Sequence, residues 1–168
     1  MPSPAAIVDQ LRGLIIAKEN PLSVKHAART AAIAVVSFLL AELFRLPEAY
    51  WAAITALVVA QSPGVAMPIA AQYCAGTAVG AAVGGWAGTF FPGNLLIFGM
   101  SVLAMGIFFA PFRLERSAYR YASITVAIVM LVPSHSGWIV ALHRFLEVSV
   151  GIAVGLGASA IWPERRVE

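Results

Sequence analysis

The side chains best suited to chemistry lie in an apolar stretch near the C-terminus. His143, Arg144 and Glu147 fall within the segment Trp138–Trp162, which carries no other charged residue. Charged groups in such segments are costly and usually face a cavity or a partner. Arg144 and Glu147 are three positions apart, so they can meet on one face of a helix. We therefore expect these residues to face the interior of a helix bundle.

A second pair of charges, Glu42 and Arg45, ends an apolar segment further upstream. We expect it at the same level of the bundle as Arg144 and Glu147, in one ion-paired cluster. Two interpretations of that cluster stay open. The charges form static salt bridges that hold the fold, or Arg144 holds a carboxylate substrate while Glu147 or His143 exchanges a proton.

Further polar residues are candidates for the other end of a pathway. His26 and Arg29 open the first apolar segment. They either attract an anion or serve as topology signals that extend toward lipid headgroups. Gln61 and Gln72 flank the stretch Pro63–Pro68, for which we expect an uncharged loop between two proline-broken ends. This loop is our second candidate for a cavity lining.

The composition excludes a soluble globular protein. Of the 168 residues, 60% are hydrophobic and 11% are charged, and the mean hydropathy is +0.84. A soluble domain has about 25% charged residues. The formal net charge of +3 comes from basic residues scattered singly, which is not the pattern of a nucleic-acid-binding protein.

Enzymatic chemistry has little support in the sequence. Cys74 is the single cysteine, so an internal disulfide and a cysteine-based metal site are excluded. The three histidines are scattered, without the spacing of a metal site or a catalytic triad. No GxxxxGK[ST] phosphate loop is present. We expect no enzyme, no cofactor and no metal.

The hydrophobic pattern predicts an all-α polytopic membrane bundle with six transmembrane helices. From Ala49 to Phe112 there is no Asp, Glu, Lys or Arg, and one crossing needs about 20 residues. Breakers at Pro63-Gly64, Pro68 and Pro92-Gly93-Asn94 divide this run. The six expected segments are Ala27–Phe44, Ala49–Ser62, Ile69–Phe91, Leu95–Ala110, Tyr119–Val132 and Trp138–Trp162.

The distribution of basic residues orients these six segments. With both termini in the cytoplasm, the inner side receives nine of the 11 basic residues: Arg12, Lys18, Lys25, Arg29, Arg113, Arg116, Arg120, Arg165 and Arg166. That excess follows the positive-inside rule. The aromatic residues Tyr50, Trp51, Trp86, Trp138 and Trp162 are expected to form interfacial belts.

The N-terminal region differs from the rest of the chain. Residues 1–24 have helically spaced apolar positions and no signal-peptide pattern. They predict an amphipathic helix that lies in the membrane interface or packs on the end of the bundle. Residues 25–168 form the six-helix transmembrane domain.

The two halves of that domain resemble each other. Ala52, Thr55 and Val59 match Ala122, Thr125 and Val129 at a constant offset of 70 residues. Gly80 and Gly84 match Gly151 and Gly155 in the same way, at an offset that is one residue larger. The first three expected segments therefore recur as the last three. Because each half has an odd number of crossings, the two halves would be inverted repeats, an arrangement typical of transporters.

Glycines spaced by four indicate where helices approach closely. The expected packing positions are Gly76, Gly80, Gly84 and Gly88 on the third segment, with Gly151 and Gly155 on the sixth. Small residues let backbones come into contact in a membrane. Packing alone explains these columns, and sliding of the helices during a transport cycle is the alternative.

Three stretches resemble the fusaric-acid-resistance-like family, which includes the aromatic acid exporters. They are Tyr50–Val59, Gly76–Gly84 and Arg144–Gly155, the last followed by Trp162-Pro163. The resemblance covers the membrane portion and implies a bacterial inner-membrane permease for aromatic carboxylic acids or drugs. Many members of the family carry a large cytoplasmic region and a second membrane block, whereas this chain resembles a half-size member. That difference suggests a homo-oligomer.

These observations favour one function over two alternatives. The leading hypothesis is an efflux permease of the inner membrane that exports small anionic aromatic compounds, driven by a proton gradient. The alternatives are a non-transporting membrane scaffold or accessory subunit, and a passive channel. The expected partners are the lipid bilayer, an organic anion and further copies of the chain, with a periplasmic efflux partner as a further possibility and without nucleic acid.

Overall fold

The structure is a computed structural model that describes residues 24–60, 63–110, 116–132 and 136–162. The chain divides into two units, Met1–Ala31 and Ala32–Glu168. The amphipathic helix expected for residues 1–24 lies outside the described residues, apart from its final position.

Every regular element in the described part of the chain is a helix, which confirms the all-α class. The helices are α2 (Val24–Leu43), α3 (Tyr50–Val59), α4 (Pro63–Phe90), α5 (Leu95–Phe109), α6 (Arg116–Leu131) and α7 (Gly137–Ile161). Each corresponds to one of the six apolar segments of the sequence. Asn94 caps α5 with its side-chain oxygen, which accepts from the N–H groups of Leu96 and Ile97.

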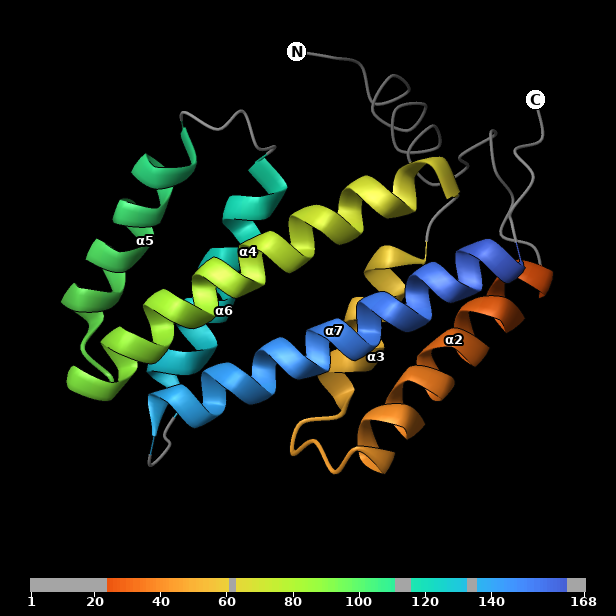
Figure 1. The fold of residues 1–168 in the computed structure, drawn as a ribbon, viewed down its shortest axis with the longest axis horizontal. Coiled ribbons are helices and arrows are strands. Elements are labelled where there is room, and N and C mark those ends of the chain that lie inside the picture. Colours follow the sequence, from red (N-terminus) through yellow and green to blue (C-terminus); the bar gives the residue numbers. More distant parts are fainter. Residues whose placement is uncertain (1–23, 61–62, 111–115, 133–135, 163–168) are drawn as a thin grey trace, which may run out of the picture. The chain divides into compact units, whose positions relative to one another are not determined.

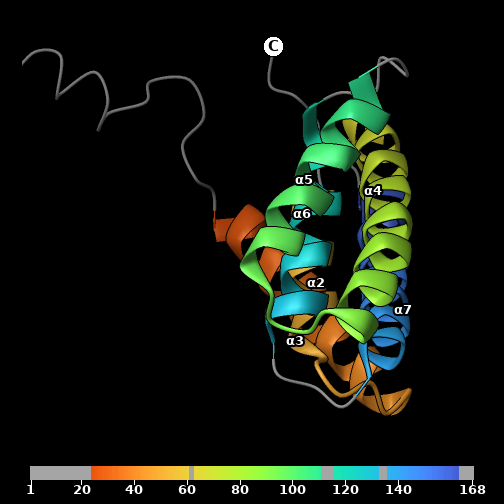
Figure 2. The ribbon, with the colours of Figure 1, turned by 90° about the vertical axis from the view of Figure 1, so that its left-hand side faces the viewer.

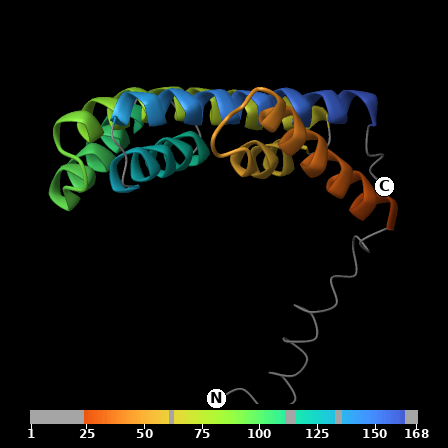
Figure 3. The ribbon, with the colours of Figure 1, turned by 90° about the horizontal axis from the view of Figure 1, so that it is seen from below.

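Four of these helices form a two-layered core within the second unit. The long helices α4 and α7 lie side by side in one layer, and the shorter α3 and α6 lie beneath them (Figures 1, 2 and 3). In this arrangement α3 packs on α7, whereas α6 packs on α4. Helix α5 lies against α6.

The glycine columns lie where these helices touch. A Cβ added to Gly80 on α4 would lie 2.5 Å from the Ala122 carbonyl oxygen, and one on Gly151 of α7 would lie 2.5 Å from that of Ala52. A Cβ at Gly84 would lie 3.1 Å from the Val129 side chain. The backbones of α4 and α6, and of α7 and α3, therefore approach as closely as their residues permit.

The other glycines of both columns also lie close to the helix that faces them. A Cβ at Gly155 would lie 2.9 Å from the Val59 side chain, and one at Gly88 3.1 Å from the Val129 carbonyl oxygen. A Cβ at Gly76 would clash with the Ala118 carbonyl oxygen.

Two turns meet at one end of the core. The Gly93 N–H in the α4–α5 turn donates to the Met130 carbonyl oxygen near the end of α6, at 3.0 Å. A Cβ added to Gly137, the first residue of α7, would lie 2.8 Å from the Thr89 nitrogen. The end of α4, the end of α6 and the start of α7 are therefore neighbours.

The described surface is apolar while several polar groups are buried. Leu96, Leu103 and Ile107 on α5 and Ile139 and Leu142 on α7 are each more than half exposed. Three helices have the length and composition of membrane spans: Val24–Leu43, Val65–Phe90 and Gly137–Ile161. Large contiguous apolar surface is typical of contact with lipid. The chain is a multi-pass membrane protein.

The loop expected at Pro63–Pro68 is wrong. These residues form the start of α4, and Pro68 lies inside the helix. A proline is well tolerated at the first helical position, because the N–H it lacks has no partner there. Pro68 gives up only the bond to the carbonyl of Gly64, close to the helix end.

Candidate functional site

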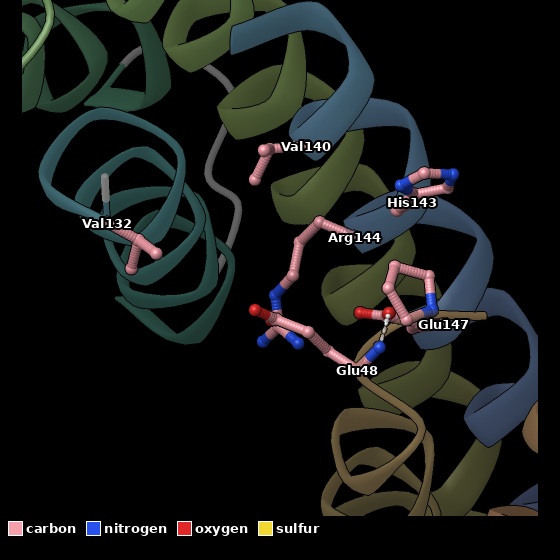
Figure 4. A pocket seen from close by; sticks show the side chains of 7 residues that line it. Glu48, Val132, Val140, His143, Arg144 and Glu147 are labelled. Carbon is pink, nitrogen blue, oxygen red and sulfur yellow. Dashed lines mark hydrogen bonds between the residues drawn. The ribbon is translucent and has the colours of Figure 1, made fainter. Parts of the chain in front are cut away.

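A cavity of about 170 Å³ lies where α3 and α7 begin and α6 ends. Both polar and apolar side chains line it (Figure 4). The lining residues are Pro47, Glu48, Val132, Val140, His143, Arg144 and Glu147. Four of these seven side chains are ionisable, in a part of the protein where charge is costly.

Arg144 holds the central position in this site. Its side chain is 2% exposed, and its guanidinium lies 3.7 Å from the centroid of the Trp51 ring. Such stacking of a cation on an aromatic ring contributes about 0.5–2 kcal/mol. The nitrogens Nε and Nη1 are buried and have no hydrogen-bond partner among the described residues. Two donors of a buried cation are thus unsatisfied by the described residues, which is costly for a charged group.

Glu147 is also buried, and its partner is a backbone group. Its Oε1 accepts from the Glu48 N–H at 2.9 Å, shown by the dashed line in Figure 4. The Glu48 carboxylate in turn accepts from Trp51 Nε1 at 2.8 Å. These bonds tie the segment before α3 to the middle of α7. They also fix the ring on which Arg144 stacks.

The structure brings together only part of the predicted cluster. Arg144, Glu147 and His143 line one cavity. Among the described residues no hydrogen bond joins Arg144 to Glu147: Glu147 Oε1 accepts the Glu48 N–H, and Nε and Nη1 of Arg144 have no partner. Glu42 and Arg45 have exposed side chains and lie outside the cavity lining. Arg45 instead adopts a positive φ of 55° in the turn that ends α2.

The other candidates lie elsewhere. Gln72 on α4 accepts from the Ser117 hydroxyl at 2.5 Å, outside the Arg144 cavity. Gln61 lies outside the described residues. His26 and Arg29 belong to the first unit of the chain, where Arg29 is buried.

Sequence reasoning missed Glu48 and Trp51. The sequence predicts only an interfacial position for Trp51, whereas in the structure its ring is also half-buried between Glu48 and Arg144. A signal for Glu48 was present in the sequence, since it is the last charged residue before the long uncharged run. Nothing in the sequence paired either residue with Arg144, because the contact joins α3 to a helix almost a hundred positions later.

The donor set suits an organic anion better than a metal. Within the described ranges, no group of three His, Cys, Asp or Glu side chains could hold a metal ion. The guanidinium of Arg144 presents a planar fork that matches a carboxylate. The apolar residues Val132 and Val140 line the remainder of the space.

The match to known families covers most of this architecture. The model of the family described as fusaric acid resistance protein-like matches residues 33–158, from α2 to the last turns of α7. The chain belongs to that family. No curated protein and no solved structure matches the chain. The fusaric acid resistance protein-like match includes all the residues that line the Arg144 cavity.

Proposed function

We propose that this protein is an efflux permease that exports small anionic aromatic compounds and binds their carboxylate at Arg144. The observation that carries the proposal is the buried Arg144 guanidinium, which lines a cavity and has two unbonded nitrogens. Arg144 shares the cavity with the side chains of Glu48 and Glu147, yet these two nitrogens have no hydrogen-bond partner among the described residues. Burying a charge costs several kcal/mol unless its hydrogen bonds are satisfied. Family membership supports transport as the class of function.

The size and lining of the cavity support a one-ring substrate. An apolar cavity of about 150 Å³ in another protein binds benzene, and the Arg144 cavity measures about 170 Å³. In our proposal the carboxylate meets the guanidinium, and the ring lies against Val132 and Val140. Trp51, on which the guanidinium stacks, holds that cation in place.

Coupling to a proton gradient is assigned to the acidic side of the cavity. Glu147 lines the cavity and is buried, and His143 lies one position from Arg144 on the same wall. A proton taken up by Glu147 would remove a negative charge beside the anion site. Proton binding and anion binding at neighbouring positions are then linked through their charges.

Six crossings with both termini in the cytoplasm form part of the proposal. The cavity lining joins the α2–α3 turn to the end of α6 and the start of α7. The α4–α5 turn is bonded to the end of α6. If each of the six helices crosses the bilayer, every second turn between helices lies at the same end of the bundle. The protein would then lie in the bacterial inner membrane.

An inverted repeat is supported by equivalent contacts in the two halves. Gly80 approaches the Ala122 carbonyl oxygen, as Gly151 approaches that of Ala52. The helices that correspond in the proposed halves, α3 and α6, are both short, with 10 and 16 residues. Short segments at corresponding positions of two repeats are typical of transporter binding sites. Assembly as a homo-oligomer, with or without a periplasmic partner, belongs to the same proposal.

The proposal is tested by equilibrium binding of labelled benzoate to the purified protein in detergent. Arg144→Gln should lower the affinity about 10–100-fold, because a hydrogen bond to a charged group contributes about 1.5–3 kcal/mol. Arg45→Gln removes the same charge outside the cavity and should bind as the wild type does. Equal binding by the wild type and Arg144→Gln would contradict the proposed site. An absence of binding to every aromatic carboxylate would favour the scaffold.

A further inference from the structure

Two helix pairs pack through glycines, α3 with α7 and α4 with α6. Each pair carries one stacked pair of side chains. The Arg144 guanidinium on α7 lies 3.7 Å from the centroid of the Trp51 ring on α3. The rings of Tyr73 on α4 and Tyr121 on α6 have centroids 3.9 Å apart. Trp51 and Tyr121 correspond at the offset that relates α3 to α6. Tyr73 and Arg144 correspond at the offset of the glycines that relates α4 to α7.

The two stacks differ in the residues beside them. Where the first has Glu48 and Glu147, the second has Ala118 and Gly76 at the corresponding positions. Glu147 accepts the Glu48 N–H through its carboxylate, whereas Gly76 brings α4 directly against the Ala118 carbonyl. In the second half, backbone contact between α4 and α6 therefore takes the place of the two carboxylates, and these two helices are in direct contact.

In the second half, a hydrogen bond occupies the position that corresponds to the cavity of the first half. Pro47 and His143 line the Arg144 cavity, and their counterparts are Ser117 and Gln72. Ser117 Oγ donates to Gln72 Oε1 at 2.5 Å, joining α6 to α4. The first half is thus open at this position, whereas in the second half the hydrogen bond between Ser117 and Gln72 closes it.

These two places lie on opposite sides of the middle of the core. Helices α4 and α7 run antiparallel, because a Cβ at Gly85 would meet Trp138 and one at Gly137 would meet the segment around Gly88 (Figure 1). The Arg144 cavity lies at the end where α7 begins. Ser117 is the second residue of α6, which begins at the other end. In the proposed transport function, an anion that crosses the protein between these helices would pass both places.

We propose that the Tyr73–Tyr121 stack and the Ser117–Gln72 bond form a closed gate on the path of the anion. The structure then represents the state open at the Arg144 end. In the opposite state, the first half adopts the closed conformation of the second half, and the second half adopts the open conformation of the first. This change opens the gate and closes the Arg144 cavity, as alternating access requires. This inference rests on the proposed transport function and adds the residues that hold the path shut.

The first test removes the aromatic stack. Tyr73→Ala should let labelled benzoate equilibrate across proteoliposomes without a proton gradient, at least 10-fold faster than the wild type. Tyr73→Phe keeps the ring and should retain coupled transport. Tyr119→Ala is the control for the loss of a tyrosine ring next to α6, because Tyr119 is half-buried, whereas Tyr73 is buried, and lies near Gly106 of α5. It should retain coupled transport.

The second test holds the gate shut. Gln72→Cys and Ser117→Cys are combined with Cys74→Ser and joined by a short, reducible bifunctional thiol reagent. Crosslinking should abolish transport, reduction should restore it, and benzoate should still bind at Arg144. Each single cysteine treated in the same way should transport at the same rate before and after reduction.

The outcomes separate the gate from the function itself. Loss of transport on crosslinking, with a leak in Tyr73→Ala, supports the gate. Undiminished transport by the fully crosslinked protein overturns it while the proposed function stands. A wild-type protein that moves no carboxylate overturns the proposed function and, with it, the gate.

Discussion

At the scale of single residues, the site depends on how the charges share their partners. Glu147 and Trp51 both bond to Glu48, through its N–H and its carboxylate. Arg144 lies over the Trp51 ring, with Nε and Nη1 unbonded. Within the described residues, the acidic groups therefore accept from neutral donors, while two nitrogens of the cation have no partner. In the proposed function, a substrate carboxylate supplies that partner.

Replacement of Glu147 tests its role in proton coupling. Glu147→Gln should fold normally, because the amide oxygen can still accept the Glu48 N–H. Benzoate binding should persist, whereas the dependence of flux on an imposed pH gradient should disappear. The measurement compares proteoliposome flux with and without the gradient, alongside the thermal unfolding midpoint. A variant whose flux responds to the gradient as the wild type does would remove Glu147 from the coupling mechanism.

At the scale of the elements, glycine contacts set the distances between helices. The columns on α4 and α7 place backbone against backbone, on α6 and α3 respectively. Because a carbonyl oxygen cannot move aside as a side chain can, these positions have no room for a methyl group. The same contacts hold Trp51 and Arg144 on facing helices at the distance that their stacking needs.

Alanine substitutions separate tight positions from open ones. Gly80→Ala and Gly151→Ala should each destabilise the protein by about 1–3 kcal/mol, the usual cost of overpacking. Gly157→Ala on α7 and Gly99→Ala on α5 meet nothing within 4 Å and should leave stability unchanged or slightly raised. Thermal unfolding in one detergent provides the comparison. Equal stability in all four variants would contradict the close approach.

The sequence predicted the elements better than the pairing between them. Charge-free runs and breakers located all six helices, and the family resemblance is confirmed by the match over residues 33–158. The start of α4 was missed because Pro63 and Pro68 are compatible with a helix near its N-terminus. The role of Trp51 was missed because a cation–π contact between distant segments has no local pattern. Arg144 could be found because an arginine in an apolar helix is conspicuous by composition alone.

At the scale of the whole molecule, the described helices carry large apolar side chains on their outer surface and bury the charged side chains of Arg144 and Glu147. Its described surface would require a bilayer, and three of its helices are long enough to cross one. The Arg144 cavity lies at the end where α3 and α7 begin. In the proposed function, the side of the membrane that this end faces is the side from which the cavity is open.

Cysteine labelling in cells tests the proposed topology. In a Cys74→Ser background, Asn94→Cys and Ser136→Cys should react with an impermeant maleimide from outside intact spheroplasts. Their turns lie at the same end of the core. A cysteine at Ser117 should react only after the membrane is opened. Labelling of Asn94→Cys and Ser136→Cys from different sides would exclude the arrangement with six crossings.

The central claim is that Arg144 binds the carboxylate that the protein transports. Its most direct test is accumulation of labelled benzoate in inside-out vesicles, with an imposed proton gradient, for the wild type, Arg144→Gln and Arg45→Gln at equal protein levels. The wild type and Arg45→Gln should show gradient-dependent accumulation, and Arg144→Gln should lose at least 10-fold. Accumulation by Arg144→Gln at the wild-type rate would contradict the claim.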